Sequence, residues 1–428
     1  MYKTGDKVRI VTEKDEVTGI FMPRPEILDN DFVVVKLENG YNIGIKKERI
    51  REILLVEKYI PTETTTVKIK YNPNLPTISV LSTGGTISSR IDYRTGGVHA
   101  DYTAEDFVQM LPHLASIANI KAKKVASIMS EDMCPSDWRM MARAIRKEFE
   151  EGADGVVITH GTDTLHFSTA AVSFMLKNLT KPVVFTASQR SIDRGSSDAF
   201  INLGCAIIAA ASDIAEVMTC LHGTIDDEYC LLVRGTKVRK MHSSRRDAFR
   251  PINENPIAKV FPSGKIETIN QCFRKRSDGM PELDDAFEPK VALVLAYPGM
   301  EPEIIDFYIA KGYKGIVISA SALGHVPTNN PEYSILPSIE RATGKNIPVV
   351  IASQTIYGRV HPYVYTNLRK LSMQLGCIYA EDMLPEVAYV KLGWVLGHTQ
   401  DKKKIKDMML SNIAGEISER SNAQCFLF

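Results

Sequence analysis

The sequence lacks the paired cysteines that a zinc site or a disulfide framework needs. Seven cysteines are scattered along 428 residues, none belongs to a CxxC pair, and their number is odd. Isolated cysteines of this kind are typical of small buried side chains in a reducing compartment. We therefore expect no disulfide, and we expect no metal among the functional residues.

Long apolar runs are also missing, and so is an apolar leader. No run approaches the ~18 residues that a membrane span requires, and the first residues, MYKTGDKVRI, are charged where a signal peptide is apolar. The formal net charge is only +1, so the field of the whole chain gives no reason to expect free binding to nucleic acid or to a membrane. The sequence predicts a cytoplasmic protein of enzyme size that does not act at a membrane.

Nucleotide-binding fingerprints are absent, although one glycine-rich turn is present. The turn STGGTI, residues 82–87, follows a short apolar run. It has no GKS or GKT ending, and the chain contains no GxGxxG. We therefore expect this turn to hold something other than a phosphate, and we expect no cofactor in this chain.

The first part of the chain predicts a small β domain. The short runs KVRIV, FVVVKL and NGYNIGI alternate or are β-branched, and Asn39–Gly40 is a strong hairpin signal. Residues 1–58 thus predict an SH3-like β-barrel, whose simplest role is docking because it carries no recognisable catalytic set. Residues 59–76 are rich in threonine, proline and asparagine and predict a linker.

The rest of the chain alternates between strand-like and helix-like segments. Short apolar runs such as DGVVITH and KPVVFTA are separated by helical stretches such as WRMMARAIRKEFEEG. This alternation predicts βαβ units and a mainly parallel sheet over residues 77–276. A polar, punctuated stretch follows, and residues 290–428 then predict a second, smaller α/β domain that ends in two helices.

Polar residues gather just after two of these predicted strands. The turn STGGTI follows one strand, and THGTDTL, residues 159–165, follows another. Ligands of an open parallel sheet bind beyond the carboxyl ends of its strands, so the two threonine-rich turns can share one site. A third candidate is Lys240, which lies in the non-helical polar stretch VRKMHSSR.

Threonine, aspartate and lysine without metal-ligand spacing suit covalent catalysis at a carbonyl. A threonine hydroxyl is a weak nucleophile, and a desolvated lysine held by a carboxylate can act as its base. Backbone N–H groups in the turns at Gly84–Gly85 and Gly161 can stabilise the oxyanion. Structural alternatives stay open, because Thr162 and Asp163 can cap a helix and Lys240 stands among other basic residues.

STGGTI and THGTDTL together resemble the two signature segments of the L-asparaginase/glutaminase family. Further similar segments follow in order: SEDM at residues 130–133, KPVVFTASQR at 181–190, and the lysine segment that ends at Phe249. The resemblance covers residues 77–428. It implies an asparaginase-like two-domain architecture with parallel sheets and with the active site in the first of the two domains.

The resemblance also implies a catalytic role for each matching residue. Thr86 would be the nucleophile that forms an acyl-enzyme. Tyr93, on a flap bounded by Gly96–Gly97, would help to activate that nucleophile and to close the site. Thr162 and Lys240 would complete the relay by polarising water or the nucleophile.

The same resemblance implies a set of substrate contacts. Asp163 would grip the α-amino group of an amino-acid substrate and Ser130 its α-carboxylate, beside the backbones of Gly85 and Gly161. This sequence has Glu131 where many family members have glutamine after the serine. A carboxylate at that position can still hold an ammonium group, although it adds negative charge to the site.

The predicted β domain of residues 1–58 indicates which branch of the family the chain resembles. Plain asparaginases begin near their first strand, whereas here a β domain and a linker come first. This arrangement resembles the D-subunit family of the archaeal glutamyl-tRNA(Gln) amidotransferases. It implies the glutaminase subunit of a ligase for protein biosynthesis, which takes ammonia from L-glutamine to convert Glu-tRNA(Gln) to Gln-tRNA(Gln).

That resemblance also implies a partner. An E subunit of glutamyl-tRNA(Gln) amidotransferase would join this chain in a heterotetramer of two D and two E subunits. The E subunit would bind the tRNA and would use ATP and Mg²⁺. Two other hypotheses stay open: a free L-asparaginase that acts as a homo-oligomer, and a catalytically silent scaffold protein.

Overall fold

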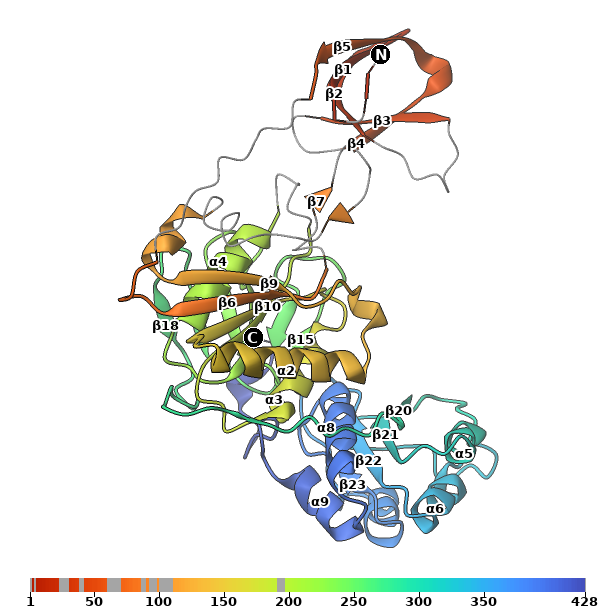
Figure 1. Ribbon diagram of the computed structural model, residues 1–428. Helices are drawn as coiled ribbons and strands as arrows, with labels where there is room; N and C mark the ends of the chain where they lie inside the picture. Colours follow the sequence, from red (N-terminus) through yellow and green to blue (C-terminus); the bar gives the residue numbers. More distant parts are fainter. Residues whose placement is uncertain are drawn as a thin grey trace.

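The computed structural model describes residues 2–3, 5–22, 31–37, 42–59, 71–85, 90–91, 98–99, 111–190 and 197–427. The predicted fold is confirmed: an asparaginase-like α/β body with two sheets follows a small antiparallel β domain. Figure 1 shows the small domain, the large sheet and the smaller sheet as successive bodies along the chain.

The small domain is a single antiparallel sheet with the strand order β4-β3-β2-β1-β5. Its strands are β1 (Lys7–Thr12), β2 (Glu16–Met22), β3 (Phe32–Lys36), β4 (Asn42–Lys46) and β5 (Ile50–Glu57). Alternate residues of β1 and β3 form a small core of their own, made of Val8, Ile10, Val33 and Val35. β3 pairs with β4 as the hairpin signal predicted, while the Asn39–Gly40 turn lies outside the described residues.

The large sheet has eight strands in the order β18-β17-β14-β13-β12-β10-β6-β9. They are β6 (Thr77–Ser82), β9 (Asn119–Lys124), β10 (Gly155–Thr159), β12 (Val183–Thr186), β13 (Val217–His222), β14 (Cys230–Arg234), β17 (Ala258–Val260) and β18 (Ile266–Thr268). The strands from β9 to β13 pair in parallel, as predicted, and β14, β17 and β18 extend the sheet antiparallel.

Helices cover both faces of this sheet. α2 (Pro135–Glu150) and α3 (Leu165–Met175) pack on one face, and α4 (Ala199–Ala210) packs on the other. α4 is apolar nearly all round and is buried along its length. A helix of this composition is typical of a position that is covered on every side. Because β6 and β10 are parallel, their carboxyl ends lie at the same edge of the sheet. The two threonine-rich turns begin at this edge.

The smaller sheet is fully parallel, in the order β20-β21-β22-β23. Its strands are β20 (Val291–Leu295), β21 (Gly315–Ala320), β22 (Val349–Ser353) and β23 (Ile378–Tyr379). Its helices are α5 (Glu303–Ala310), α6 (Leu336–Gly344), α7 (Thr366–Arg369), α8 (Pro385–His398) and α9 (Lys402–Leu410), so the two predicted terminal helices are present. Among the described residues, no helix has the length and apolar character that crossing a membrane would take.

Short elements complete the described chain. Three two-stranded ribbons are formed by β7 (Arg90–Ile91) with β8 (Val98–His99), β11 (Leu176–Lys177) with β19 (Glu282–Leu283), and β15 (Val238–Lys240) with β16 (Phe249–Pro251). Single helical turns are η1 (Lys47–Arg49), η3 (Pro112–Ser116), η4 (Ser130–Asp132), η5 (Lys370–Gln374) and η6 (Ala423–Cys425).

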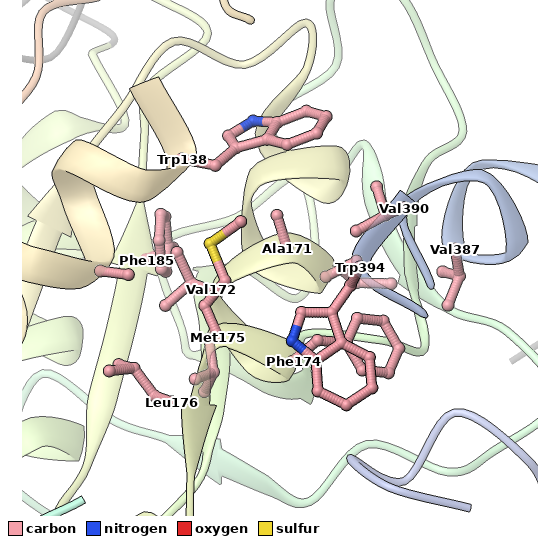
Figure 2. Close-up of a cluster of buried hydrophobic side chains, with 14 of the residues drawn as sticks. Trp138, Ala171, Val172, Phe174, Met175, Leu176, Phe185, Val387, Val390 and Trp394 are labelled. Atoms are coloured by element: carbon pink, nitrogen blue, oxygen red, sulfur yellow. The ribbon is translucent and has the colours of Figure 1, made fainter. Parts of the chain in front are cut away.

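One hydrophobic core joins the two domains of the α/β body. α3 of the first domain packs against α8 of the second, and Figure 2 shows the buried side chains between them. Phe174 stacks on Trp394 with ring centroids 6.0 Å apart. Each large apolar side chain buried in this way stabilises the fold by about 1.5–3 kcal/mol. The core therefore fixes the first turn of α8 relative to the first turn of α3, which follows the THGTDTL segment directly.

Candidate active site

Two glycine turns touch at the carboxyl edge of the large sheet. β6 and β10 are parallel neighbours, so the turns that follow them lie side by side. Gly85 has a φ of +83°, and a Cβ at that position would lie 2.6 Å from the backbone nitrogen of Gly161, which is why only glycine fits there. Thr83 joins the strands as well, because its N–H and its hydroxyl both donate to the carbonyl of Thr159, at 3.1 and 2.9 Å.

Lys240 lies beside the second turn. Its ammonium donates to Thr162 Oγ1 at 2.9 Å and to Asp163 Oδ1 at 2.8 Å. The lysine side chain is only 11% exposed, whereas that of Asp163 is 60% exposed. The structure thus brings together three of the predicted residues, with the cation sheltered and the carboxylate open to solvent. Their catalytic roles stay predictions.

The hairpin that carries Lys240 explains how a residue so distant in sequence arrives there. β15 pairs antiparallel with β16, and Lys240 lies opposite Phe249 at the end of the ribbon. Phe249 is buried in the main core, so it anchors that end. A pairing register fixes which face each side chain takes, and here it turns the lysine toward Thr162.

The helix-capping alternative for Thr162 and Asp163 does not describe what the structure shows. α3 begins at Leu165, its N-cap residue is Thr164, and no side chain caps the helix. The Asp163 carboxylate is directed to the lysine instead. The hydroxyl of Thr164 donates to the carbonyl of Ser130.

Ser130 lies beneath the same turn. It is 3% exposed, it opens the helical turn η4, and its hydroxyl accepts a hydrogen bond from the backbone N–H of Asp163 at 3.2 Å. A Cβ on Gly161 would lie 2.6 Å from the Ser130 Oγ, so the glycine makes room for the serine. Glu131, the next residue, is exposed. Ser130 therefore lies next to the Thr162–Asp163 turn, and Glu131 is its neighbour in the chain.

Two buried histidines flank the turn. His160 is fully buried, and burial lowers its pKa to about 4. Burial also lowers the pKa of His166 to about 3, helped by the nearby positive charges of Arg239 and Lys240. Both imidazoles are therefore neutral at pH 7. One ring nitrogen of His160 lies 2.7 Å from the carbonyl oxygen of Gly161, and because only an N–H can bond there, Nδ1 of the neutral ring carries the proton.

Two predicted catalytic residues fall outside the described part of the chain. They are Thr86, the predicted nucleophile, and Tyr93, the predicted flap residue. The glycine pair at 96–97 lies outside it too. Their roles stay predictions, and Gly85, which directly precedes the predicted nucleophile in the sequence, is the nearest described residue.

Two charged residues close to the cluster, Arg239 and Glu386, were not predicted from the sequence. Arg239 precedes Lys240, and Glu386 comes from the first turn of α8; they form an ion pair at 3.0 Å. No local pattern links residues so far apart in the chain. The alternation along β15 is the one available signal, since it predicts that Arg239 and Lys240 point in opposite directions.

A polar cavity of about 960 Å³ lies elsewhere in the α/β body, where β14 meets the C-terminal segment. Its walls include Arg234, Glu254, Arg274 and Ala414, and none of the predicted site residues lines it. The guanidinium of Arg234 is already held by the carboxylates of Glu216 and Glu254. The cavity therefore offers no alternative centre for the predicted chemistry.

Family models match three parts of the chain. Residues 2–56 match the GatD N-terminal domain, residues 77–273 match the asparaginase N-terminal domain, and residues 290–409 match the glutaminase/asparaginase C-terminal domain. Together they cover the small β domain and both parts of the α/β body.

Solved structures with a similar fold are L-asparaginases. The thermostable L-asparaginase from Thermococcus kodakarensis superposes with a TM-score of 0.72 at 33% identity and covers 80% of this chain and all of its own. A probable cytoplasmic L-asparaginase from Campylobacter jejuni gives a TM-score of 0.65 at 28% identity, with 79% of this chain and 100% of that one covered.

Curated relatives match the chain from end to end. The D subunit of the glutamyl-tRNA(Gln) amidotransferase of Pyrococcus furiosus is 52% identical over 99% of this chain and 97% of its own length. The protein of the same name from Methanothermobacter thermautotrophicus is 48% identical over 99% of this chain and 95% of its own length. With the small N-terminal domain matched as well, the chain belongs to the D-subunit family of the glutamyl-tRNA(Gln) amidotransferases.

Proposed function

We propose that this chain is the glutaminase subunit of a tRNA-dependent amidotransferase, in which it releases ammonia for the conversion of Glu-tRNA(Gln) to Gln-tRNA(Gln). Relatives named as the D subunit of glutamyl-tRNA(Gln) amidotransferase match 99% of the chain. The single observation that carries the chemistry is the sheltered ammonium of Lys240, held between a threonine hydroxyl and a carboxylate beside two touching glycine turns.

The proposed reaction has two stages. The hydroxyl of Thr86 attacks the side-chain amide carbon of glutamine, and the amide nitrogen takes up the hydroxyl proton and leaves as ammonia when the C–N bond breaks. This leaves a glutamyl ester on Thr86. Water then attacks the ester carbonyl, so that glutamate leaves and the threonine hydroxyl is restored. Tyr93 assists the first attack, and backbone N–H groups of Gly85 and Gly161 stabilise the negative oxygen in both stages.

Thr162 and Lys240 serve the proton transfers of this sequence. The lysine ammonium donates to the Thr162 hydroxyl at 2.9 Å, which leaves the hydroxyl proton free to point at water or at the nucleophile. A cation close to the reacting carbonyl also favours the oxyanion. Thr162 thus links the sheltered charge to the attacking oxygen.

Asp163, Ser130 and Glu131 bind the substrate's amino-acid end. Asp163 uses Oδ1 for Lys240, and its exposed carboxylate has lone pairs left for the substrate ammonium. Ser130 presents its hydroxyl to the α-carboxylate. The extra carboxylate of Glu131 favours the ammonium end, and it repels a second negative charge on the ligand.

The proposed assembly follows the family. An E subunit binds the charged tRNA, activates the tRNA-linked glutamate with ATP and Mg²⁺, and receives the ammonia. Two copies of each subunit form the heterotetramer, and the complex works in the cytoplasm. In this proposal the chain itself uses neither metal nor nucleotide.

Steady-state hydrolysis of glutamine tests the proposal. We expect slow turnover by the chain alone and a marked rise when the E subunit and Glu-tRNA(Gln) are added. Lys240→Ala should abolish both rates, while Lys265→Ala, a matched change of an exposed lysine next to β18, should leave both unchanged. Full turnover by the isolated chain, with no stimulation, would count against an amidotransferase subunit.

A free L-asparaginase is the second candidate, because the similar solved structures are asparaginases. Those structures cover about 80% of this chain, whereas the D-subunit relatives cover 99% of it. Fast, saturable hydrolysis of asparagine by the isolated chain would favour this second candidate, and its absence would remove it.

A further inference from the structure

The strand that carries Lys240 divides its side chains between the two domains. Val238 and Lys240 face the first domain: Val238 is buried in the core that contains α3, and Lys240 reaches the Thr162 turn. Lys237 and Arg239 alternate with them and face the second domain, as strand geometry requires. Every second side chain of this segment is therefore tied to the opposite domain.

Glu386 is a residue of the second domain that contacts the surroundings of the catalytic cluster. Its Oε1 lies 3.0 Å from Nη1 of Arg239 and 4.0 Å from Nε2 of His166. Its side chain is 9% exposed. It lies in the first turn of α8, behind Pro385, where the helix dipole favours a negative charge.

The two contacts of Glu386 belong to the two halves of the site. Arg239 directly precedes Lys240 on β15, and His166 lies in the first turn of α3, just after the Thr162–Asp163 turn. His166 is neutral at pH 7, since its pKa is lowered to about 3. The partner of opposite charge for Glu386 is therefore Arg239, and the ion pair holds the strand beside the turn.

The charges around the cluster explain why the ion pair between Arg239 and Glu386 matters for the position of Lys240. Arg239 and Lys240 are adjacent cations, and each has its own carboxylate: Glu386 for the first and Asp163 for the second. Without Glu386, the guanidinium of Arg239, a side chain that is 29% exposed, would lose its carboxylate partner in a partly buried place, which is costly. It would then turn toward other acceptors and take the backbone of β15 with it.

We propose that Glu386 is a positioning residue for the catalytic lysine: through Arg239, it holds β15 so that Lys240 reaches both Thr162 and Asp163. The inference rests on the proposed function of this site. It also makes the second domain a necessary part of the site, because α8 supplies the carboxylate and the shared core fixes α8 against α3.

Glutamine hydrolysis by the full chain with its partner subunit tests the proposal through kcat and KM. We expect Glu386→Gln to lower kcat by about tenfold to a hundredfold, as misplacement of a catalytic group does, and to change KM by less than about threefold, since Asp163 and Ser130 stay in place. Glu386→Asp keeps the charge and should recover most of the lost kcat. In an Arg239→Met background, Glu386→Gln should cause no further loss.

The matched control is Asp284→Asn. Asp284 is a partly buried carboxylate that contacts the other end of α8 through His398, so its loss should lower thermal stability and leave kcat unchanged. If Glu386→Gln does not fold, Arg239→Met is judged by the same kcat and KM criteria. A wild-type kcat in the folded variant overturns the inference. So does equal loss of kcat in Glu386→Asp and Glu386→Gln.

Lys240→Ala distinguishes a failure of the proposed function from a failure of the positioning role of Glu386. If Lys240→Ala hydrolyses glutamine at the wild-type rate, the proposed function of the site falls, and the inference falls with it. If Lys240→Ala is inactive while Glu386→Gln has the wild-type kcat, the site stands and only the positioning role of Glu386 is wrong.

Discussion

At the scale of single residues, the candidate site depends on space as much as on charge. Gly161 leaves room for the Ser130 hydroxyl, and Gly85 leaves room for the backbone of Gly161. From the sequence alone, these glycines are expected to provide backbone N–H donors. The structure adds a steric reason, because side chains at these two positions would push the two turns apart.

Gly161→Ala should therefore disable the site without unfolding the protein. The new Cβ would lie 2.6 Å from Ser130 Oγ and 2.7 Å from Ser130 Cβ, so the turn must move, at a cost of about 1–3 kcal/mol. We expect glutamine hydrolysis to fall at least about tenfold. Gly344→Ala is the control, since a Cβ there meets nothing within 4 Å. Equal activity of the two variants would contradict this packing argument.

The buried histidines lead to a pH dependence of stability. An unfolded histidine has a pKa of about 6.5, whereas that of folded His160 is about 4 and that of His166 about 3. Below pH 6.5 these two histidines thus bind protons in the unfolded state but stay neutral in the folded state until the pH approaches 4. The free energy of unfolding therefore falls as the pH is lowered. Between pH 7 and pH 5 the loss is about 2 kcal/mol per histidine.

Urea unfolding at these two pH values measures the effect. The wild-type protein should be less stable at pH 5, and His166→Gln should show a smaller difference between the two pH values, because it carries one such group fewer. A variant with the same pH dependence as the wild type would mean that folding does not lower the pKa of His166.

At the scale of elements, α3 links the site to the interdomain core. Its first turn follows Asp163, and its later turns pack against α8 through Phe174 and Trp394. A change in the packing of Phe174 against α8 is therefore expected to shift the Thr162–Asp163 turn at the other end of α3, because close-packed interiors transmit strain.

Phe174→Ala should cost about 3–5 kcal/mol of unfolding free energy, because it opens a cavity in this core. Phe307→Ala, a change of a phenylalanine that is 51% exposed on α5, should cost less than about 0.5 kcal/mol. Chemical denaturation of both variants checks the contrast. Similar stabilities would mean that α3 and α8 do not share a rigid core.

The sequence predicted best where β6 and β10 end. Short β-branched runs that end in threonine and glycine located β6 and β10, and the parallel arrangement then predicted that the two turns meet. The antiparallel strands β14, β17 and β18 were not predicted individually. Each of the last two has three residues, too few for a periodic pattern to show.

At the scale of the whole molecule, the second domain proves to be part of the site's surroundings. Local patterns predicted Thr162, Asp163 and Lys240 together with their chemistry. They did not predict that Glu386 of α8 would lie 3.0 Å from Arg239, because that contact depends on how the two domains pack against each other. Docking follows from the shared core around α3 and α8, which no single segment reveals.

The central claim is that the Thr162, Asp163 and Lys240 cluster, with Thr86, serves the release of ammonia and not its transfer. The most direct test follows Gln-tRNA(Gln) formation by the complex of Lys240→Ala with the E subunit, first with glutamine and then with ammonium as the nitrogen donor. The account predicts loss of the glutamine-dependent reaction and a wild-type rate with ammonium. Glutamine-dependent amidation that survives the substitution would contradict it.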